Sequence, residues 1–597
     1  MSFAPKQGSA FRTLTCGLIL TVGLLIVAGC ALVKQSPTPT STVVIDPLLF
    51  TTPTANSPST PFSEPSPIPQ TTIQINATAG NDHQEDRIVL SFAREGHDHI
   101  YAYYPLSQPF VQLTSGEFDD RDPAISPDGT KIAFSSNRNG FWDLYLLDLT
   151  NGNISQLTNT QVYDGAPSWS PDGQWLTYET YNSTNFDIVV MPVGDADVPA
   201  VQLTQGMGNN FSPKWSPAGR EIVFISDRSG TKEIWLARLD VVEDRFLKIL
   251  GGANASYSSP VWSPDGSSLA WTRTVQGVST VEMAPLTDIA GGIRSYGSGS
   301  DPVWSQDGSA LLIQLSDPNA AYLVAYRVQD GVLLFPAEYF PTSIQGTDWR
   351  TATLVNDLQA VDPPPVRQPV YPLWQKSTTS MGGITDRQKL VEVPGLNAPY
   401  PYLHPAALDP FQALRDATSR QLGWDFLGTL DDAVLPISEP PQPGISENWL
   451  FTGRAINLNS APLTAGWVSV TREDFGGKVY WRVWVRCLNQ DGSCGEPQIH
   501  PSWDFSARYN GDSNAYEEGG KTGTIPDGYW VDFSRLALTY GFERNGALGN
   551  WRSYFQGTLF NQFVFRQGLS WQEAMLQLYP ADTVSTLNSV ATLPVNQ

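Results

Sequence analysis

Few residues in the last third of the chain could do chemistry. Between residues 397 and 597 there are only two histidines, His404 and His500. A hydrolytic zinc site needs three protein ligands and an open position for water. A metal-dependent hydrolase would therefore require an atypical ligand set, drawn from His404, Asp425, His500, Asp504 and Glu543.

Two other hydrolytic chemistries have little support in the residues. Asp504 with Glu517 or Glu518 could form the carboxylate pair of a glycoside hydrolase, but their spacing equally suits solvated surface. A serine peptidase of the α/β-hydrolase kind would need a Gly-x-Ser-x-Gly elbow between a strand and a helix. No such motif follows residue 355, so this class is excluded.

Residues 448–457 resemble the central motif of the VanY-like zinc D,D-carboxypeptidases, Ser-x-His-x-x-Gly-x-Ala-x-Asp. Gly453 and Ala455 match that motif, whereas its Ser, His and Asp positions hold Asn448, Leu450 and Asn457. Leu cannot coordinate a metal, and Asn binds transition metals poorly. The resemblance therefore implies a degenerate peptidase domain that lacks metal and catalysis and still binds a glycan or a peptide.

The elements that precede these residues form a repeat. A short phrase returns six times, at spacings of 44, 46, 47, 42 and 45 residues. It is centred on Ile125, Trp169, Trp215, Trp262, Trp304 and Trp349. The fullest copy, ISPDGTKIAFSSNRNGFWDLYLLDLTNGNISQLT, contains a turn followed by short alternating strands. A period of about 40 to 45 residues with three or four strands predicts the radially packed blades of a β-propeller.

The phrase has a physical explanation. Its proline, as in Pro127, presets φ for a tight turn, and its glycine, as in Gly129, supplies the positive φ that the turn needs. The aromatic residue before the turn is expected to pack between neighbouring blades. This packing role is predicted for Trp169, Trp215, Trp262, Trp304 and Trp349.

SPDG followed by IAFSSNR and a (D/E)-(L/I)-(Y/W) strand is similar to the TolB-type six-bladed propeller. The resemblance covers residues 87–355 and implies six blades, closed by pairing of the segment after Trp349 with the first blade. It also implies a partner such as a peptidoglycan-associated lipoprotein. In TolB-like chains, however, the small extra domain precedes the propeller, whereas here it follows, so this chain departs from the domain order of the Tol-pathway proteins.

The remaining chain divides into a Pro-rich connector, 356–396, and a smaller α+β domain, 397–597. We therefore expect a multi-domain fold, with an all-β propeller followed by this domain. Two helices are predicted within residues 404–438, the first capped by Asp409 with Pro410 at its first position. Alternating apolar residues predict strands at 467–474 and 478–487, and the last part returns to helix.

Two cysteines are predicted to form a disulfide. Cys487 and Cys494 flank Asp491-Gly492, which predicts a hairpin turn. A disulfide across this turn fits an oxidising compartment. A zinc site would need two further ligands, and none stands nearby at suitable spacing.

The N-terminus predicts export. An apolar run from Leu18 ends in Val27-Ala28-Gly29-Cys30 and is short for a membrane span. This ending resembles the bacterial lipobox, in which the cysteine becomes the lipidated first residue, so residues 1–30 are expected to be a lipoprotein signal peptide and Cys30 the acylated, palmitate-bearing residue. Residues 31–86 are rich in Ser, Pro and Thr and predict a disordered stalk.

The charge restricts the partners. A net charge of −23 with no cluster of Lys and Arg makes nucleic acid and anionic lipid headgroups poor partners. No cofactor is expected. The alternative is structural calcium in the Asp-rich turns at 117–122 and 227–230, although the same residues are ordinary turn formers.

Together these patterns predict a binding or scaffold protein, anchored by lipid to a bacterial membrane on its extracytoplasmic side. The propeller would recognise a protein or cell-envelope component, and the non-catalytic C-terminal domain would bind peptidoglycan or another glycan. The alternative is a cell-wall hydrolase, a metal-dependent carboxypeptidase or amidase that uses the atypical ligand set.

Overall fold

The structure is a computed structural model, and it describes residues 84–104, 110–194, 198–252, 254–354, 360–361, 373, 389–439 and 444–591. The predicted signal peptide, Cys30, nearly all of the predicted stalk and most of the predicted connector lie outside these residues. The chain divides into two compact units, 1–64 and 65–597, and all described residues belong to the second. None of the described helices is both long and apolar enough to span a bilayer.

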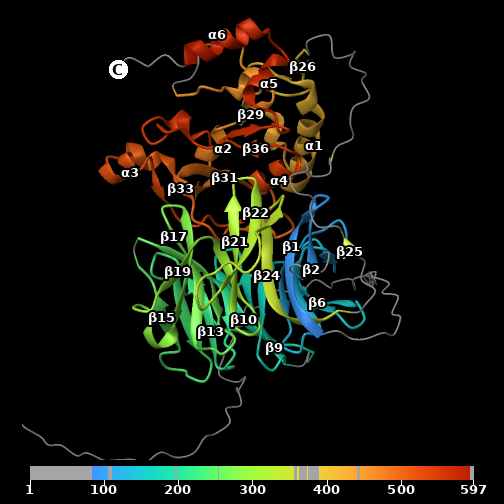
Figure 1. Ribbon diagram of the computed structural model, residues 1–597, viewed down its shortest axis with the longest axis vertical. Coiled ribbons are helices and arrows are strands. Elements are labelled where there is room, and N and C mark those ends of the chain that lie inside the picture. The colour runs from blue at the N-terminus through green and yellow to red at the C-terminus, as the bar shows by residue number, and fades with distance from the viewer. Residues whose placement is uncertain are drawn as a thin grey trace, which may run out of the picture. The chain divides into compact units, whose positions relative to one another are not determined.

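Six antiparallel sheets follow one another along the first part of this unit and form the blades of a propeller (Figure 1). Blade two consists of β4 (Asp120–Ile125), β5 (Lys131–Ser136), β6 (Asp143–Asp148) and β7 (Ile154–Gln156), and blade three of β8 (Tyr163–Trp169), β9 (Trp175–Tyr181), β10 (Phe186–Pro192) and β11 (Val201–Gln202). Blade four consists of β12 (Asn210–Trp215), β13 (Glu221–Ser226), β14 (Glu233–Arg238) and β15 (Phe246–Leu250), and blade five of β16 (Ser256–Trp262), β17 (Ser268–Val275), β18 (Val278–Pro285) and β19 (Arg294–Ser298). Blade six consists of β20 (Ser300–Trp304), β21 (Ala310–Asp317), β22 (Ala320–Arg327) and β23 (Glu338–Phe340).

Blade one closes the ring. Its strands β1 (Gln84–Arg94), β2 (His97–Tyr103) and β3 (Phe110–Gln112) are joined by β24 (Ile344–Thr353), which comes from the end of the propeller. Ile88 lies opposite Trp349, so the closing strand contains the sixth tryptophan instead of following it. The short strand β25 (Ala360–Val361) pairs with the outer edge of β3. Six blades, predicted from the repeat, are present.

In blades two to six the repeated phrase ends the first strand and forms the turn to the second. In blade two the Gly129 N–H donates to the Ser126 carbonyl at 2.9 Å, and the Ser126 hydroxyl donates to the Asp128 carboxylate at 2.6 Å. Neighbouring turns touch: Gly173 faces the ring of Pro127, and the same contact recurs from Gly219 to Pro171. The turns therefore form a ring on one face of the propeller, which we call the turn face.

The tryptophan of the phrase lies at the blade boundary. Trp169 is 8% exposed, and its indole N–H donates to the Ala124 carbonyl of blade two at 2.9 Å. Trp262 makes the equivalent bond to Lys214 of blade four at 3.0 Å. Trp304 is buried in a cluster shared by blades five and six. Trp215 and Trp349 are only partly buried, and the indole of Trp215 donates within its own turn.

Each first strand also contains a bulge. Five residues adopt φ between 48° and 52° immediately before a proline: Asp122, Ala166, Ser212, Ser259 and Asp301. Gly346 takes the sixth place. Proline has no N–H for the ladder and is confined to edges and bulges, and the first strand is the inner edge of its blade. The strain at these positions is offset in part because the freed N–H groups bond to the preceding blade, as from Ser212 to the Glu179 carboxylate at 2.7 Å.

The C-terminal region mixes helices and strands, as predicted. Its helices are α1 (Pro405–Leu422), α2 (Ala461–Thr464), α3 (Ser513–Glu517), α4 (Phe533–Thr539), α5 (Trp571–Leu576) and α6 (Ala581–Ala591). One sheet has the order β28 (Leu430–Asp432), β29 (Ala455–Leu458), β37 (Gln562–Val564), β36 (Glu543–Arg544), and a second the order β30 (Val468–Phe475), β31 (Lys478–Arg486), β35 (Tyr529–Asp532), β32 (Glu496–Pro497). The short pairs are β26 (Val391–Glu392) with β27 (Tyr402–Leu403), and β33 (Trp503–Asp504) with β34 (Lys521–Thr522).

The prediction of two helices in residues 404–438 was wrong. A single helix begins at Pro405, capped by the His404 imidazole, and Pro410 lies inside it. Pro405 already occupies the first helical position, so Asp409 is not the cap. After Gly423, at φ 80°, the chain forms only a 3-10 turn and then β28.

The propeller and the C-terminal region share one hydrophobic core. A continuous cluster contains Phe211 and Trp271 of blades four and five together with Phe411, Trp481 and Phe533 of the C-terminal region. No packing boundary separates the two parts within this cluster, so we expect them to behave as one structural body.

Candidate functional site

The peptidase-like motif occupies structural positions. Asn448 caps the 3-10 helix η4 (Trp449–Thr452) by accepting the Leu450 N–H at 3.0 Å, and the Leu450 side chain is 1% exposed. Gly453 ends that helix at φ 62°. Ala455 is buried at the start of β29. Each residue is explained by local folding.

Asn457 is held by neighbours on the same sheet. Its amide donates to the Asp432 carboxylate at 2.9 Å and accepts from the Gln562 amide at 3.1 Å. This hydrogen-bonded set connects β28, β29 and β37. The side-chain amide of Asn457 uses both its donor and its acceptor to connect these strands, so its position is explained without a metal.

The atypical ligand set is not brought together. His404 accepts the Ala406 N–H at 3.1 Å, and burial lowers its pKa to about 3. Asp425 pairs with Arg415 at 2.6 Å, and Glu543 with Arg566 at 2.9 Å. Asp504 caps a 3-10 helix. His500 lies near blade four, among charges that include Lys232. Within the described ranges, no three His, Cys, Asp or Glu side chains form a metal-binding group.

The Asp-rich turns proposed for calcium are used in other ways. Asp119 accepts the Asp98 N–H at 2.9 Å, and Asp120 pairs with Arg138 at 2.7 Å. Asp227 accepts both the backbone N–H and the side-chain amide of Asn209, at 2.7 and 2.8 Å. These carboxylates fix loops of the propeller.

A group of paired charged side chains lies where the C-terminal region meets the propeller. This happens on the face where the first strands begin, opposite to the turn face, and we call it the covered face. Arg121, at the start of blade two, pairs with Asp98 at 2.7 Å and with Glu496 of β32 at 2.5 Å. Asp98 of blade one also pairs with Arg535 of α4. Asp98 is fully buried and therefore needs both guanidinium groups.

Other blades bond the C-terminal region directly. The Gly528 N–H donates to the Tyr181 hydroxyl of blade three at 2.7 Å, and the Asp474 N–H donates to the Gly277 carbonyl of blade five at 3.1 Å. Arg544 donates to the Pro318 carbonyl of blade six at 2.7 Å. Blades one, two, three, five and six are thus connected to the C-terminal region by hydrogen bonds or ion pairs.

Arginines also neutralise a buried acid on the C-terminal side of this junction. Glu473 pairs with Arg482 at 2.6 Å and with Arg544 at 2.5 Å. Burial opposes ionisation, yet the two guanidinium groups hold the pKa of Glu473 at about 2. Arg482 pairs further with Asp532 at 2.6 Å, which joins β31 to β35. Glu473 is therefore ionised and fully paired at neutral pH.

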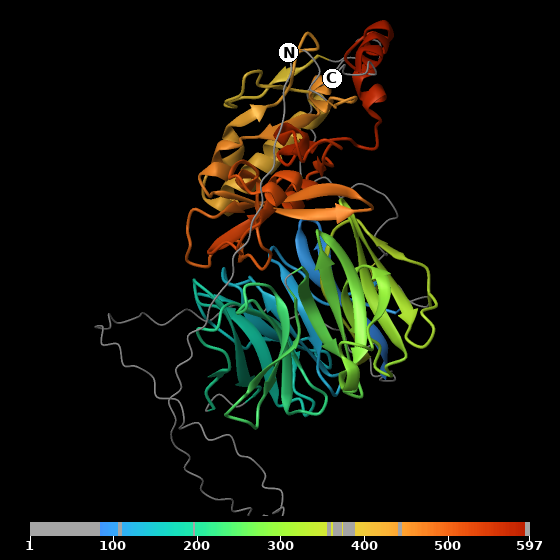
Figure 2. The same cartoon turned by 90° about the vertical axis from the view of Figure 1, so that its left-hand side faces the viewer.

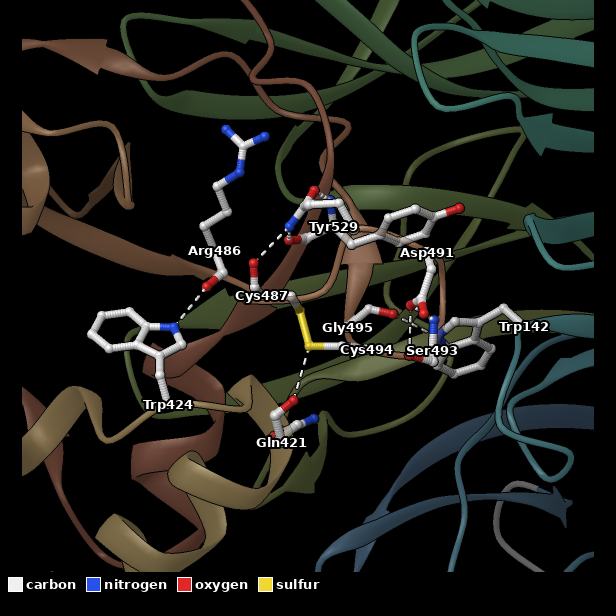
Figure 3. Close-up of a disulfide and its surroundings, with 11 residues drawn as sticks. Trp142, Gln421, Trp424, Arg486, Cys487, Asp491, Ser493, Cys494, Gly495 and Tyr529 are labelled. Carbon is white, nitrogen blue, oxygen red and sulfur yellow. Dashed lines mark hydrogen bonds between the residues drawn. A yellow bond between two sulfur atoms is a disulfide. The ribbon is translucent and has the colours of Figure 1, made fainter.

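A disulfide loop contributes to the same junction (Figure 3). Cys487 and Cys494 form the predicted disulfide. The Trp142 indole of blade two donates to the Gly495 carbonyl just after the loop, at 3.1 Å. The predicted hairpin was wrong, because β35 lies between β31 and β32 in the sheet. The disulfide thus closes a loop that crosses the end of β35 and presents Gly495 and Glu496 to the propeller.

Blade four is the exception at the covered face. Lys232, just before β14, is 7% exposed, and its ammonium lies 4.8 Å from the centre of the Phe211 ring. Burial lowers the pKa of Lys232 to about 8 and raises that of nearby Glu179 to about 7. Burial also lowers the pKa of His500 to about 3, with Lys232 acting in the same direction. As far as the described residues go, no hydrogen bond or ion pair links this blade to the C-terminal region.

A separate surface depression of about 300 Å³ lies along α1. It is lined by Leu373, Asp409, Gln412, Ala413, Asp416, Arg420 and Tyr540. None of the residues predicted from the sequence to bind a metal or to form the peptidase-like motif lines this depression. Its acidic lining does not indicate a particular ligand or reaction.

Comparison with known proteins finds similarity in the propeller. Residues 142–330 match the family described as TolB beta propeller domain. The chain contains a TolB-like β-propeller domain. TolB of the Tol-Pal system from Anaeromyxobacter dehalogenans (strain 2CP-C) is 44% identical over 62 residues, 10% of this chain and 13% of that protein. A TolB homolog from Chlorobium luteolum is 33% identical over 158 residues, 26% of this chain and 35% of that protein.

The crystal structure of TolB from Acinetobacter baumannii is similar with a TM-score of 0.39 and 19% identity, over 44% of this chain and 66% of that one. The chain spans 13% of the first curated relative's length and 35% of the Chlorobium protein's. The matches establish the TolB-like domain and extend no further.

Three features of the structure were missed by sequence reasoning. The bulges had a visible signal, since a proline stands two residues before the Trp or Ile of five of the six phrases. The position of Lys232 had a visible signal too. Like Trp142 in blade two and Phe186 in blade three, Lys232 directly precedes an acidic residue at the beginning of the third strand. The pairing of Arg121 and Arg535 with Asp98 had no sequence signal, because these residues lie up to 437 positions apart.

Proposed function

We propose that this chain is an extracytoplasmic binding or scaffold protein whose partner docks on the turn face of the TolB-like propeller. The observation that carries the proposal is the position of the C-terminal region, which bonds to five blades on the covered face. A partner of the propeller is therefore directed to the turn face, where Asp128, Asp172 and Asp265 are exposed.

Three features support the cellular setting. The Cys487–Cys494 disulfide fits an oxidising compartment outside the cytoplasm. The lipobox-like ending at Cys30 and the Ser/Pro/Thr-rich stalk would tether the body to a membrane surface. The net charge of −23 favours a basic or neutral partner.

The partner is proposed to be a component of the cell envelope. Relatives in the TolB-like part carry names that place them in the Tol-Pal system, which favours an envelope protein such as a peptidoglycan-associated lipoprotein. The resemblance of residues 448–457 to VanY-like enzymes adds peptidoglycan, or another glycan, as a second ligand through the C-terminal region. The nominated catalytic positions have structural partners, so this second role is binding.

The test blocks the turn face with side chains that do not hold turns. Ala218 and Gln306 are exposed in the turns of blades four and six, and the double variant Ala218→Arg/Gln306→Arg places two large cations there. Asn514→Arg, on exposed α3, is the matched control. Each full chain is immobilised and exposed to solubilised bacterial envelope, and the bound proteins are quantified by mass spectrometry.

We expect one set of envelope proteins to bind the wild type and Asn514→Arg and to be lost from the double variant. Equal capture by all three chains would refute docking on the turn face. The hydrolase alternative has its own outcome: release of D-alanine from purified peptidoglycan by the full chain with added zinc would show a catalytic C-terminal region.

A further inference from the structure

The loop between β22 and β23 of blade six carries three exposed aliphatic side chains in a row. Val332 is 49% exposed, Leu333 47% and Leu334 38%. Only the next residue, Phe335, points into the core, in a cluster shared by blades one and six. A run of four apolar residues is typical of a buried strand, so the three exposed members need another explanation.

Hydrogen bonds hold the backbone of this loop in place. The Arg327 N–H donates to the Val332 carbonyl at 2.8 Å, and the Leu334 N–H donates to the Ala325 carbonyl at 2.8 Å. The Val332 N–H donates in turn to the Asp330 carboxylate at 3.1 Å. The outward side chains are therefore fixed before any partner arrives, which lowers the entropy cost of binding.

Blade two shows what the same loop contains elsewhere in the propeller. By the register of the third strand, Asn153 is the counterpart of Val332, and Ser155 is the counterpart of Leu334. In both blades the N–H that ends the third strand closes the same turn, with the Asn153 carbonyl at 2.9 Å and with the Val332 carbonyl at 2.8 Å. Asn153 and Ser155 are exposed polar residues. Blade six thus has two aliphatic side chains where the same turn in blade two has polar ones.

Blade five extends this apolar surface. Ile293 is 41% exposed. Arg294, beside it, donates to the Gln329 carbonyl at 3.0 Å, in the turn that precedes Val332, and so joins the two loops. We call the exposed aliphatic residues of these loops the apolar rim, which consists of Ile293, Val332, Leu333 and Leu334.

The apolar rim borders the turn face. The Val328 N–H donates to the Ser309 carbonyl in the turn of blade six at 2.9 Å. That turn exposes Asp307, and the turn of blade five exposes Asp265. Hydrogen bonds from serine hydroxyls lower the pKa of both carboxyls, so both are ionised at neutral pH. An apolar surface therefore lies next to fixed negative charges.

We propose that the apolar rim binds an amphipathic segment of the protein partner, in which aliphatic side chains are flanked by lysines or arginines. The inference rests on the proposed docking at the turn face and names the part of that face that supplies apolar contact. Binding removes the aliphatic side chains from water, and the flanking cations meet Asp265 and Asp307. The net charge of −23 disfavours an anionic membrane or a second copy of this chain as the occupant, because either adds negative charge.

The test measures binding of two labelled peptides to the full chain by fluorescence anisotropy. Both peptides are amphipathic helices with leucine on one face, and the other face carries lysine in the first peptide and glutamate in the second. The variant Val332→Asn/Leu334→Ser gives blade six the residues of blade two. Val242→Asn/Leu247→Ser is the matched control, because Val242 and Leu247 are exposed aliphatic residues of blade four, outside the rim.

The lysine peptide is expected to bind the wild type and the control equally. Its affinity for Val332→Asn/Leu334→Ser should be lower by roughly tenfold or more, because two aliphatic contacts are lost. The glutamate peptide should bind none of the chains. The variant should unfold at the wild-type temperature, since Asn and Ser fill these positions in blade two, and it should retain less of the envelope proteins that the wild type captures.

Equal affinity of the lysine peptide for the wild type and the variant would overturn the proposal, as would no binding to the wild type. Binding to phosphatidylcholine vesicles, or self-association in sedimentation, that only the variant loses would also refute it, in favour of a membrane or a second copy. Full envelope capture by the variant but not by Ala218→Arg/Gln306→Arg would refute the rim and leave docking on the turn face standing. If the variant does not fold, Ile293→Ser decides by the same comparisons.

Discussion

Equivalent positions in the blades show how single residues adapt the propeller to its cover. At the start of the third strand the repeat places two aromatic rings, a doubly paired Asp98 and the lone Lys232. Each solution changes what the blade can contact: the rings pack, Asp98 binds two arginines, and the Lys232 ammonium lies against the Phe211 ring. The residue at this position therefore differs between blades one to three, which bond to the C-terminal region, and blade four, for which the described residues show no such bond.

The titration of Lys232 gives a prediction at this scale. Its pKa falls from 10.5 to about 8 in the folded chain, by burial, against the opposing charges of Asp227 and Glu179. A lowered lysine pKa means that the unfolded chain binds more protons between pH 8 and 10.5, so folding stability from this group rises with pH in that window. The difference of about 2.5 pKa units corresponds to about 3 kcal/mol.

Lys232→Met removes this group, so its free energy of unfolding should lack that rise. Urea unfolding of both chains at several pH values between 8 and 10.5 measures the difference, with Lys248→Met as the control that keeps the rise. Parallel curves for the wild type and Lys232→Met would show that Lys232 has an ordinary pKa.

At the scale of elements, the disulfide loop positions β32 for its contacts with blade two. It closes residues 487–494, and Gly495 and Glu496 directly after it bond to Trp142 and Arg121. Glu496 also lies opposite Trp530 of β35 in the strand ladder. The loop therefore holds β32 both in its sheet and against the propeller. Loss of the disulfide is expected to weaken the contacts of β32 with β35 and with blade two.

The double variant Cys487→Ser/Cys494→Ser should lower the free energy of unfolding by about 2–3 kcal/mol, the loop-closure value for a ring of this size. Denaturant unfolding under non-reducing conditions measures the loss. When reductant is added to the wild type, its free energy of unfolding should fall towards that of the double variant. A variant as stable as the wild type would mean that the loop is held by its other contacts alone.

The elements also show what the sequence could and could not predict. The blades were predictable because the turn and the following strand are local chemistry, repeated along the chain with Pro-x-Gly in four copies and Gln-Asp-Gly in a fifth. The sequence-based start of α1 was wrong. The helix begins at His404 and Pro405, whereas Asp409-Pro410, inside the helix, has the same pattern as a helix start. The position of β32 could not be predicted, since β35, more than 30 residues later, inserts beside it.

The candidate site was less predictable than the fold. Asn457 and Leu450 were recognised as unsuited to a metal, and the structure gives them partners in the sheet and core. The junction was missed because it depends on charges from distant segments, as in the pairing of Asp98 with Arg535. Such pairs produce no recognisable motif or periodic pattern in the sequence.

At the scale of the whole molecule, a propeller and a smaller region share a core and are joined at five blades, by ion pairs at blades one and two and by hydrogen bonds at blades three, five and six. The strand colours in Figure 2 distinguish the blades, from blue to yellow-green, and the C-terminal elements, from yellow to red. The hydrophobic cluster that contains Trp271 and Trp481 crosses this colour boundary. The two parts should therefore unfold together.

Calorimetry of the full chain should show one cooperative transition for both parts. Because the shared core and the buried Arg121–Asp98–Arg535 set couple them, Arg121→Met should lower that single transition by about 3–5 kcal/mol in free energy, as expected when a buried charge loses a partner. Two well-separated transitions in the wild type would show that the parts are independent.

The most direct test of the account is hydrogen–deuterium exchange of backbone amides on the two faces of the propeller. We predict slow exchange on the covered face, around Asp98 and Trp142, because both residues are buried and bond to Arg535 and Gly495 of the C-terminal region. Exchange should be faster in the turns at 171–174 and 264–267. Equally fast exchange on both faces would contradict a C-terminal region that covers the propeller, and with it the assignment of the turn face as the surface for partners.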